Sequence, residues 1–160
     1  EVKEAILPLQ TMEMWNIRKT LEAFGTEVEE FRSEFEKQAP FNPELAFDDA
    51  YSSIDEFYNK TIGMEKRAKD FNNLETLFDM ARSGYRQLKE TCNDLGLLKE
   101  LWDAIAIVKY TFDDWKSTLW DKIDTDDLLT RVKDLSSQIK YLPKELKGWR
   151  IYQWLVEDVK

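Results

Sequence analysis

The chain has 160 residues, a net charge of −9 and an isoelectric point near 4.7. This acidic balance argues against nucleic acid and anionic membranes as main partners, because both attract concentrated positive charge. Charged residues make up 34% of the chain and only 5 glycines and 4 prolines interrupt it, which is typical of long amphipathic helices rather than of a disordered tail. No apolar run is long enough to span a bilayer and no signal peptide is recognisable. Because the first residue is Glu1 and not methionine, we expect a segment of a longer protein.

The first predicted helix carries an apolar residue at alternating steps of three and four positions. This spacing places the apolar side chains on one seam, which another helix must cover. Gly25 weakens the pattern locally, at a cost of about 1 kcal/mol relative to alanine. In the turn that follows, Asn42 is expected to cap the next helix, with Pro43 in its first turn. The seam residues are Met14, Ile17, Leu21, Phe24, Val28, Phe31 and Phe35.

A second helix is predicted to extend to about Phe71 and to pair with the first as an antiparallel hairpin. The polar stretch from Asp70 to Asn73 is interpreted as a junction between this hairpin and the rest of the chain. We therefore divide the chain into residues 1–72 and residues 73–160, with a hinge hypothesised at that junction. The seam of the second helix consists of Ala50, Ile54, Phe57, Thr61, Met64 and Ala68.

The rest of the chain is also predicted to be helical. One helix begins near Asn73, with Gly96 as its kink or end, and its seam runs from Leu77 to Cys92. The next carries a heptad seam from Leu98 to Leu119, flanked by Trp102 and Trp120. Asp124 or Thr125 starts a further helix, Pro143 stops it, and a last helix follows from Trp149. No stretch alternates with a period of two, so the predicted fold class is all-α: elongated antiparallel helical bundles of about five to six helices with heptad-like seams.

The chemical inventory predicts no catalytic role for this chain. Histidine is absent, which removes the commonest general base and metal ligand, and no glycine-rich phosphate loop occurs. Cys92 is the only cysteine, so no intrachain disulfide can form, and a reducing compartment such as the cytosol is expected. The acidic group at residues 121–127 lacks the glycine and glutamate of a calcium loop and is interpreted as a helix cap. We expect no metal or cofactor here.

Tryptophans are frequent toward the C-terminal end of the chain. Core packing explains them most simply, whereas anchoring of another domain is the alternative, because tryptophan is enriched at interface hot spots. Trp149 and Trp154 cannot both point inward on one ideal helix, since they are five residues apart. The candidate packing or interface residues are Trp115, Leu119, Trp120, Leu142, Pro143, Trp149, Tyr152 and Trp154.

In this region the sequence resembles dynein heavy chains, particularly those of the axonemal (ciliary) type. The C-terminal pattern consists of Trp115, Leu119-Trp120, Ile123-Asp124, a leucine-rich helix, Leu142-Pro143-Lys144, Trp149, Tyr152 and Leu155. The order of these motifs is similar to that at the start of the linker domain. The N-terminal motifs, similar to the neck before the linker, are Ile6-Leu7-Pro8-Leu9 and Met14-Trp15 through Phe24-Gly25, and Leu77-Phe78-Asp79 also fits.

The resemblance implies a non-catalytic mechanical segment of a microtubule-based ATPase motor. Residues 1–72 would form the neck and residues 73–160 the first part of the linker, while ATP and magnesium would bind to AAA+ modules elsewhere in the parent protein. Implied partners are the linker and AAA+ ring of the same heavy chain, with intermediate or light chains as further candidates, in the cytoskeleton of the ciliary axoneme. Microtubules would be reached only through the parent protein.

Two other classes of protein remain as alternatives to a motor segment. One is a spectrin-like helical scaffold that binds partner proteins, and phosphate loops downstream in the parent chain would distinguish the motor from it. The other is an enzyme or calcium-binding module that uses the acidic clusters, for which titration with calcium and magnesium is the direct test.

Overall fold

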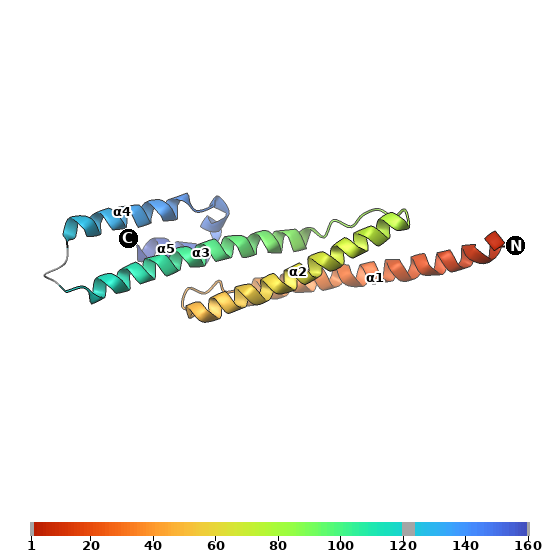
Figure 1. The fold of residues 1–160 in the computed structure, drawn as a ribbon, viewed down its shortest axis with the longest axis horizontal. Coiled ribbons are helices and arrows are strands. Elements are labelled where there is room, and N and C mark those ends of the chain that lie inside the picture. The colour runs from red at the N-terminus through yellow and green to blue at the C-terminus, as the bar shows by residue number, and fades with distance from the viewer. Residues whose placement is uncertain (1, 120–123, 160) are drawn as a thin grey trace. The chain divides into compact units, whose positions relative to one another are not determined.

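The computed structural model describes residues 2–119 and 124–159, with side chains from residue 11 onward. Within these ranges the chain is helical and contains no β-strand, which confirms the all-α prediction (Figure 1). None of the described helices is long and apolar enough to cross a membrane. The elements are α1 (Val2–Gln38), α2 (Phe47–Leu77), α3 (Arg86–Ser117), α4 (Thr125–Tyr141), the short 3-10 helix η2 (Lys144–Gly148) and α5 (Arg150–Asp158).

The chain divides into two compact units, which are described separately below. The first unit contains Glu1–Gln38 and Phe57–Cys92, and the second contains Ala39–Glu56 and Asn93–Lys160. The predicted division into neck and linker at residues 72 and 73 concerns function, and it stays a prediction.

In the first unit, most of the predicted seam residues of α1 and α2 are buried. On α1 the buried residues run from Leu21 to Phe35, whereas Met14 and Ile17 are only half-buried. On α2, Thr61 is fully buried among apolar residues, and its hydroxyl donates to the Phe57 carbonyl at 2.8 Å. That bond satisfies a polar group which would otherwise be costly to bury. The 3.6-residue period therefore predicts this core correctly.

The ring of Phe24 is at the centre of the first unit. It packs against Phe71 with ring centroids 4.8 Å apart and against Tyr85 at 5.0 Å. The Arg67 guanidinium lies 4.7 Å from the Phe24 ring, and it also binds both oxygens of Glu27, at 2.6 and 2.7 Å. Arg67 thus covers the core with its planar group while its charge is paired at the surface.

The connection between α1 and α2 differs from the prediction. Asn42 accepts a hydrogen bond from the Glu44 backbone N–H at 3.0 Å, which closes a turn, and α2 begins only at Phe47. Asn42 is therefore not the cap of α2, and Pro43 is not in its first turn. Asp48 and Asp49 occupy that turn, where negative charge favours a helix N-terminus.

The predicted helix break at residues 70–73 is wrong. Helix α2 continues to Leu77, because Phe71 packs into the core while Asp70 and Asn73 face solvent. The actual break lies at residues 78–85, and α3 starts at Arg86 rather than near Asn73. Consequently Leu77, predicted as a seam residue, is 76% exposed.

In the second unit, α3 supplies much of the core. It passes through Gly96 without ending, and Leu98, Leu101, Ile105 and Val108 are all buried as their heptad spacing predicts. Gly96 is tolerated because a single glycine costs only about 1 kcal/mol in a helix that is otherwise well packed.

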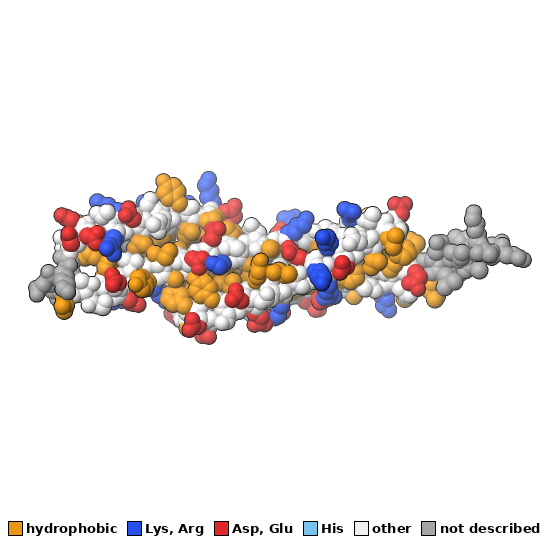
Figure 2. Space-filling view, in the orientation of Figure 1, with side chains coloured by type: hydrophobic (Ala, Val, Ile, Leu, Met, Phe, Trp, Pro, Cys, Tyr) orange, Lys and Arg blue, Asp and Glu red, His pale blue; other side chains and the backbone are white. Residues whose placement is uncertain are grey.

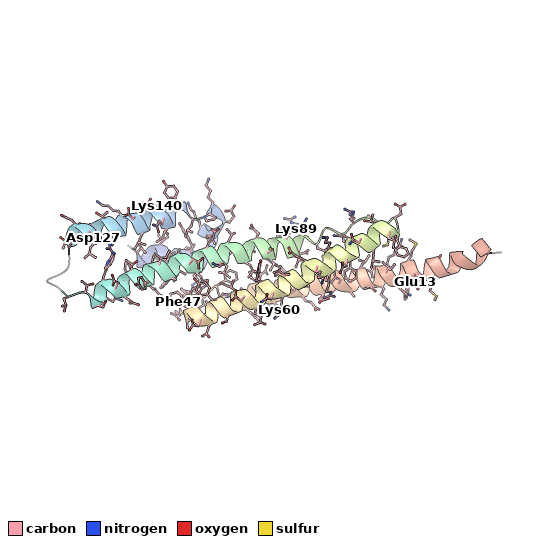
Figure 3. All side chains as sticks on the ribbon, viewed as in Figure 1. Glu13, Phe47, Lys60, Lys89, Asp127 and Lys140 are labelled. Atoms are coloured by element: carbon pink, nitrogen blue, oxygen red, sulfur yellow. The ribbon has the colours of Figure 1, made fainter. Side chains whose placement is uncertain are left out.

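Helix α4 begins where the sequence predicted. The Asp124 carboxylate accepts hydrogen bonds from the N–H groups of Asp126 and Asp127, at 2.9 and 3.3 Å, which confirms its interpretation as a helix cap. Asp127 and Lys140 lie near opposite ends of the helix (Figure 3). Each charge is at the end where the helix dipole favours it.

Candidate functional site

Proline chemistry shapes the connection between α4 and α5. Pro143 has no N–H and disfavours a helical conformation at the preceding residue, so Leu142 is extended, with φ −56° and ψ 149°. The Leu142 N–H still reaches the Ile139 carbonyl at 3.3 Å and ends α4 there. The Pro143 carbonyl then accepts from the Leu146 N–H at 3.2 Å, which begins η2. The Leu142-Pro143 pair therefore turns the chain from α4 toward α5.

Trp149 joins the start of α5 to the segment before α2. Its backbone is extended, its N–H reaches the Leu146 carbonyl at 2.9 Å, and its own carbonyl accepts from the N–H groups of Tyr152 and Gln153. The Trp149 ring packs edge-on against Phe41, with centroids 5.1 Å apart. Such pairs contribute about 0.5–1.5 kcal/mol beyond their burial. Trp149 is half-buried and serves as a packing residue of the second unit.

Tyr152 and Trp154 attach α5 to two different helices. Tyr152 is buried, and its hydroxyl donates to the Ile139 carbonyl of α4 at 3.4 Å. Trp154 is half-buried beside α3, where the Lys109 ammonium lies 5.6 Å from its ring centroid. The same ammonium lies 5.0 Å from the ring of Phe47, the first residue of α2, which is labelled in Figure 3. Lys109 thus bridges two aromatic rings through cation–π contacts.

The remaining candidates do not join this cluster. Trp115 is half-buried near the C-terminal end of α3, and its ring packs against Phe112 at 5.4 Å. Leu119 is 67% exposed. Trp120 lies outside the described residues. The other five candidates, Leu142, Pro143, Trp149, Tyr152 and Trp154, lie in the segment from the end of α4 to α5 and contact different neighbours.

Trp102 is the central aromatic residue of the second unit, and the sequence placed it only beside the seam. It is fully buried, its Nε1–H donates to the Pro40 carbonyl at 2.8 Å, and its ring lies edge-on to Phe47 at 5.9 Å. Together with Leu98, Leu101 and Ile105 it makes the buried stripe of α3 broader than a heptad seam. A stripe of that width is typical of a helix covered by more than one neighbour.

A polar cluster on α2 and α3 completes this region. The Tyr51 hydroxyl donates to the Asp103 carboxylate at 2.6 Å, and the Lys99 ammonium binds the same carboxylate at 2.8 Å. Burial, followed by the hydrogen bond and charge of Asp103, raises the pKa of Tyr51 to about 12. Burial pushes the pKa of Asp103 upward, but hydrogen bonds from Lys99 and Tyr51 outweigh it and lower the pKa overall. A general base works best with a pKa near neutrality, so these shifts favour a structural role for the cluster.

In the part of the chain that the structure describes, no three His, Cys, Asp or Glu side chains converge as a metal site would require. The Cys92 thiol is half-buried, and burial, with the charge of Glu65 adding to it, raises its pKa. A thiol of raised pKa is a poor nucleophile.

Comparison with known proteins identifies the chain. A family model described as "Dynein heavy chain, N-terminal region 2" matches residues 88–160. The flagellar outer-arm dynein beta chain of Chlamydomonas reinhardtii is 37% identical over 171 residues, which cover 99% of this chain. The ciliary dynein beta chain of Tripneustes gratilla is 33% identical over 159 residues, and dynein axonemal heavy chain 17 of Mus musculus is 32% identical over 160 residues.

The match covers nearly the whole of this chain but only a small part of each relative. The chain spans 4% of the Chlamydomonas and Tripneustes proteins and 3% of the mouse protein. A general helical scaffold, the alternative interpretation of the sequence, finds no support in these relatives. The chain belongs to the dynein heavy chain family, as a segment of its N-terminal region.

Proposed function

We propose that this segment is a non-catalytic mechanical element of an axonemal dynein heavy chain. It would connect the tail to the linker of a microtubule-based ATPase motor that drives ciliary movement, with residues 1–72 as neck and residues 73–160 as the start of the linker. ATP and magnesium would bind elsewhere in the parent protein. Partners would be the linker and AAA+ ring of the same chain, with intermediate or light chains as further candidates, in the ciliary axoneme.

The observation that carries this proposal is the length of the helices together with their buried seams, which run from Leu21 to Phe35 on α1 and from Leu88 to Val108 on α3. Helix α1 has 37 residues and α3 has 32, which correspond to about 55 and 48 Å at the usual rise per residue. Isolated helices in water are marginal, and tertiary packing along a seam stabilises them. A long helix packed in this way resists bending, so a displacement at one end is carried to the other.

The groups that hold the second unit together support the same role. Trp102, Trp149 and Tyr152 each combine an aromatic contact or deep burial with a backbone hydrogen bond. Such contacts fix the relative positions of α3, α4 and α5 within that unit. A fixed arrangement of helices is the property that a mechanical part needs.

The test destabilises helix α1 in the full-length heavy chain through substitutions that leave its buried side chains unchanged. Glu29 and Glu30 are exposed residues of α1. Replacing both by glycine costs about 1 kcal/mol per position through backbone entropy, whereas replacing both by alanine does not. We expect the glycine variant to hydrolyse ATP at the normal rate but to move microtubules more slowly in a gliding assay. The alanine variant should match the wild type in both assays.

The two measurements separate a mechanical role from others. Equal gliding velocity in the glycine and alanine variants would contradict the proposal. A loss of ATP turnover in the glycine variant alone would also contradict it, since this segment would then control catalysis instead of transmitting motion.

A further inference from the structure

A groove of about 330 Å³ lies between α3 and α4 in the second unit. Leu135 and Ile139 of α4 and Val108 of α3 form its buried apolar part. Ile107, which also lines the groove, is 50% exposed, and Leu142 is half-buried. Figure 2 shows hydrophobic side chains along the strip between these two helices. Burial of such apolar surface by a partner is favourable, because it removes the surface from water.

The two ionisable side chains that line the groove are both acidic. Glu100 and Asp103 of α3 line it, and no lysine or arginine is among the described residues that do so. Glu100 is exposed and pairs with no cation in the described ranges. Asp103 is held in its ionised form by Lys99 and Tyr51. Because the Lys99 ammonium already compensates the charge of Asp103, Glu100 is the carboxylate that remains for a partner. An apolar floor beside this carboxylate fits an amphipathic helix that carries a lysine or arginine next to its apolar face.

We propose that a basic amphipathic helix from elsewhere in the same heavy chain occupies this groove. The chain makes up only 4% of the length of its relatives, so most of the polypeptide lies outside the structure. A free partner loses translational and rotational freedom on binding, and this loss opposes association. A segment of the same polypeptide avoids most of that loss, because tethering gives it an effective concentration in the millimolar range. The proposal concerns packing and does not depend on force transmission by the segment.

The test is photo-crosslinking in the full-length heavy chain. Benzoylphenylalanine replaces Ile107 in the groove or, as a matched control, Ile62 of α2, which is similarly exposed at 46%. We expect irradiation of the Ile107 variant to yield a cross-linked peptide from the same heavy chain, rich in lysine or arginine and apolar at helical spacing. The Ile62 variant should not yield that peptide. A cross-link from position 107 only to a different polypeptide, or none at all, would overturn the proposal.

A charge reversal tests the electrostatic part of the inference. Glu100→Lys should reduce the yield of the Ile107 cross-link about threefold or more, whereas Glu44→Lys, at an exposed position outside the groove, should leave it unchanged. Changing the facing lysine or arginine of the cross-linked peptide to glutamate should restore the yield in the Glu100→Lys background. Equal yields from the two lysine variants would contradict recognition by charge. Because both glutamates are exposed, neither substitution disturbs the core.

Discussion

The indole of Trp102 fills the core of the second unit and also donates its N–H to the carbonyl of Pro40. Pro40 is itself buried, so this carbonyl has no solvent to replace the donor. A buried acceptor left without a partner costs about 1–3 kcal/mol, in addition to the volume lost when a large side chain is shortened. Trp102 therefore couples the segment before α2 to α3 through both packing and hydrogen bonding.

The Trp102→Phe variant should be less stable by about 2–4 kcal/mol, because it leaves a cavity and an unsatisfied Pro40 carbonyl. Urea denaturation of the 160-residue chain, followed by circular dichroism, measures the change. Trp15→Phe is the control, since Trp15 is 61% exposed on α1 and its replacement should shift stability by less than about 0.5 kcal/mol. Similar losses in the two variants would show that the Trp102 contacts contribute nothing specific.

The phenol of Tyr51 provides a second residue-scale prediction. Its pKa is raised to about 12 by burial and by Asp103, so it should remain protonated while a tyrosine in the unfolded chain, near 10, ionises. NMR of chains with labelled tyrosine, with Tyr51→Phe for assignment, should follow this titration. In Asp103→Asn the negative charge is gone, and the pKa of Tyr51 should fall toward 10 without reaching it, because burial persists. A Tyr51 pKa at its ordinary value in the intact chain would contradict the contact.

The raised pKa of Tyr51 determines how the stability of the fold depends on pH. A group whose folded pKa is above its unfolded pKa contributes its full stabilisation below the unfolded value, here 10. That contribution is lost as the pH rises through about 12. Tyr51→Phe should remove this part of the alkaline pH dependence.

At the scale of elements, the end of α2 has the hydrogen bonds of a Schellman motif. The Met80 N–H reaches the Glu75 carbonyl at 2.7 Å, and the Asp79 N–H reaches the Thr76 carbonyl at 3.3 Å. Asp79 takes the left-handed conformation that this motif requires, with φ 53°. The buried Glu75 carboxylate then fixes the following loop by accepting from the N–H and hydroxyl of Ser83.

Replacing Asp79 by glycine should stabilise the first unit by about 0.5–1 kcal/mol, because glycine adopts positive φ without steric cost. Thermal unfolding of the chain measures the gain as a rise in Tm. Asp79→Ala, which has a Cβ but no polar side chain to ease the left-handed conformation, should lower Tm. If glycine and alanine gave the same Tm, the strain attributed to this position would be absent.

This motif also explains why the sequence predicted the seams but not the helix break. Seams follow from the period of the apolar residues, and the buried faces of α1 and α2 agree with it from Leu21 to Ala68. The position of the break depends on long-range and loop contacts instead. Phe71 continues α2 by packing on Phe24, and Glu75 ends it through Ser83, and neither partner is visible in a local pattern.

At the scale of the whole molecule, the candidate site could likewise be predicted only in part from the sequence. The sequence placed a helix end at Pro143, because proline has a strong local preference, and it named Trp149 and Tyr152 as candidate packing or interface residues. It underestimated Trp102, whose burial depends on the segment at Pro40 covering a second face of α3. It did not predict the cluster of Tyr51, Lys99 and Asp103, since these residues meet only after α2 and α3 have packed.

The net charge of −9 and the ion pairs of both units together predict how the molecule responds to acid. The hydrogen bond from Arg67 lowers the pKa of Glu27 below its ordinary value of 4.5, and the pKa of Asp103 is likewise lowered from 3.8. A carboxyl group whose pKa is lower in the folded than in the unfolded protein stabilises the fold at pH values above its unfolded pKa. This contribution is lost as the pH falls through the folded pKa.

Tm should therefore be nearly constant from pH 7 to about 5 and should fall below about pH 4, where 23 lysines and arginines also begin to repel one another without compensating carboxylates. Differential scanning calorimetry at low protein concentration measures this, since solubility is lowest near the isoelectric point of 4.7. The double variant Glu27→Gln, Asp103→Asn should start from a lower Tm at pH 7 and decline less steeply, because it has lost two of the groups whose protonation destabilises the fold. If its decline were as steep as that of the unmodified chain, general charge repulsion, and not these two ion pairs, would account for the acid sensitivity.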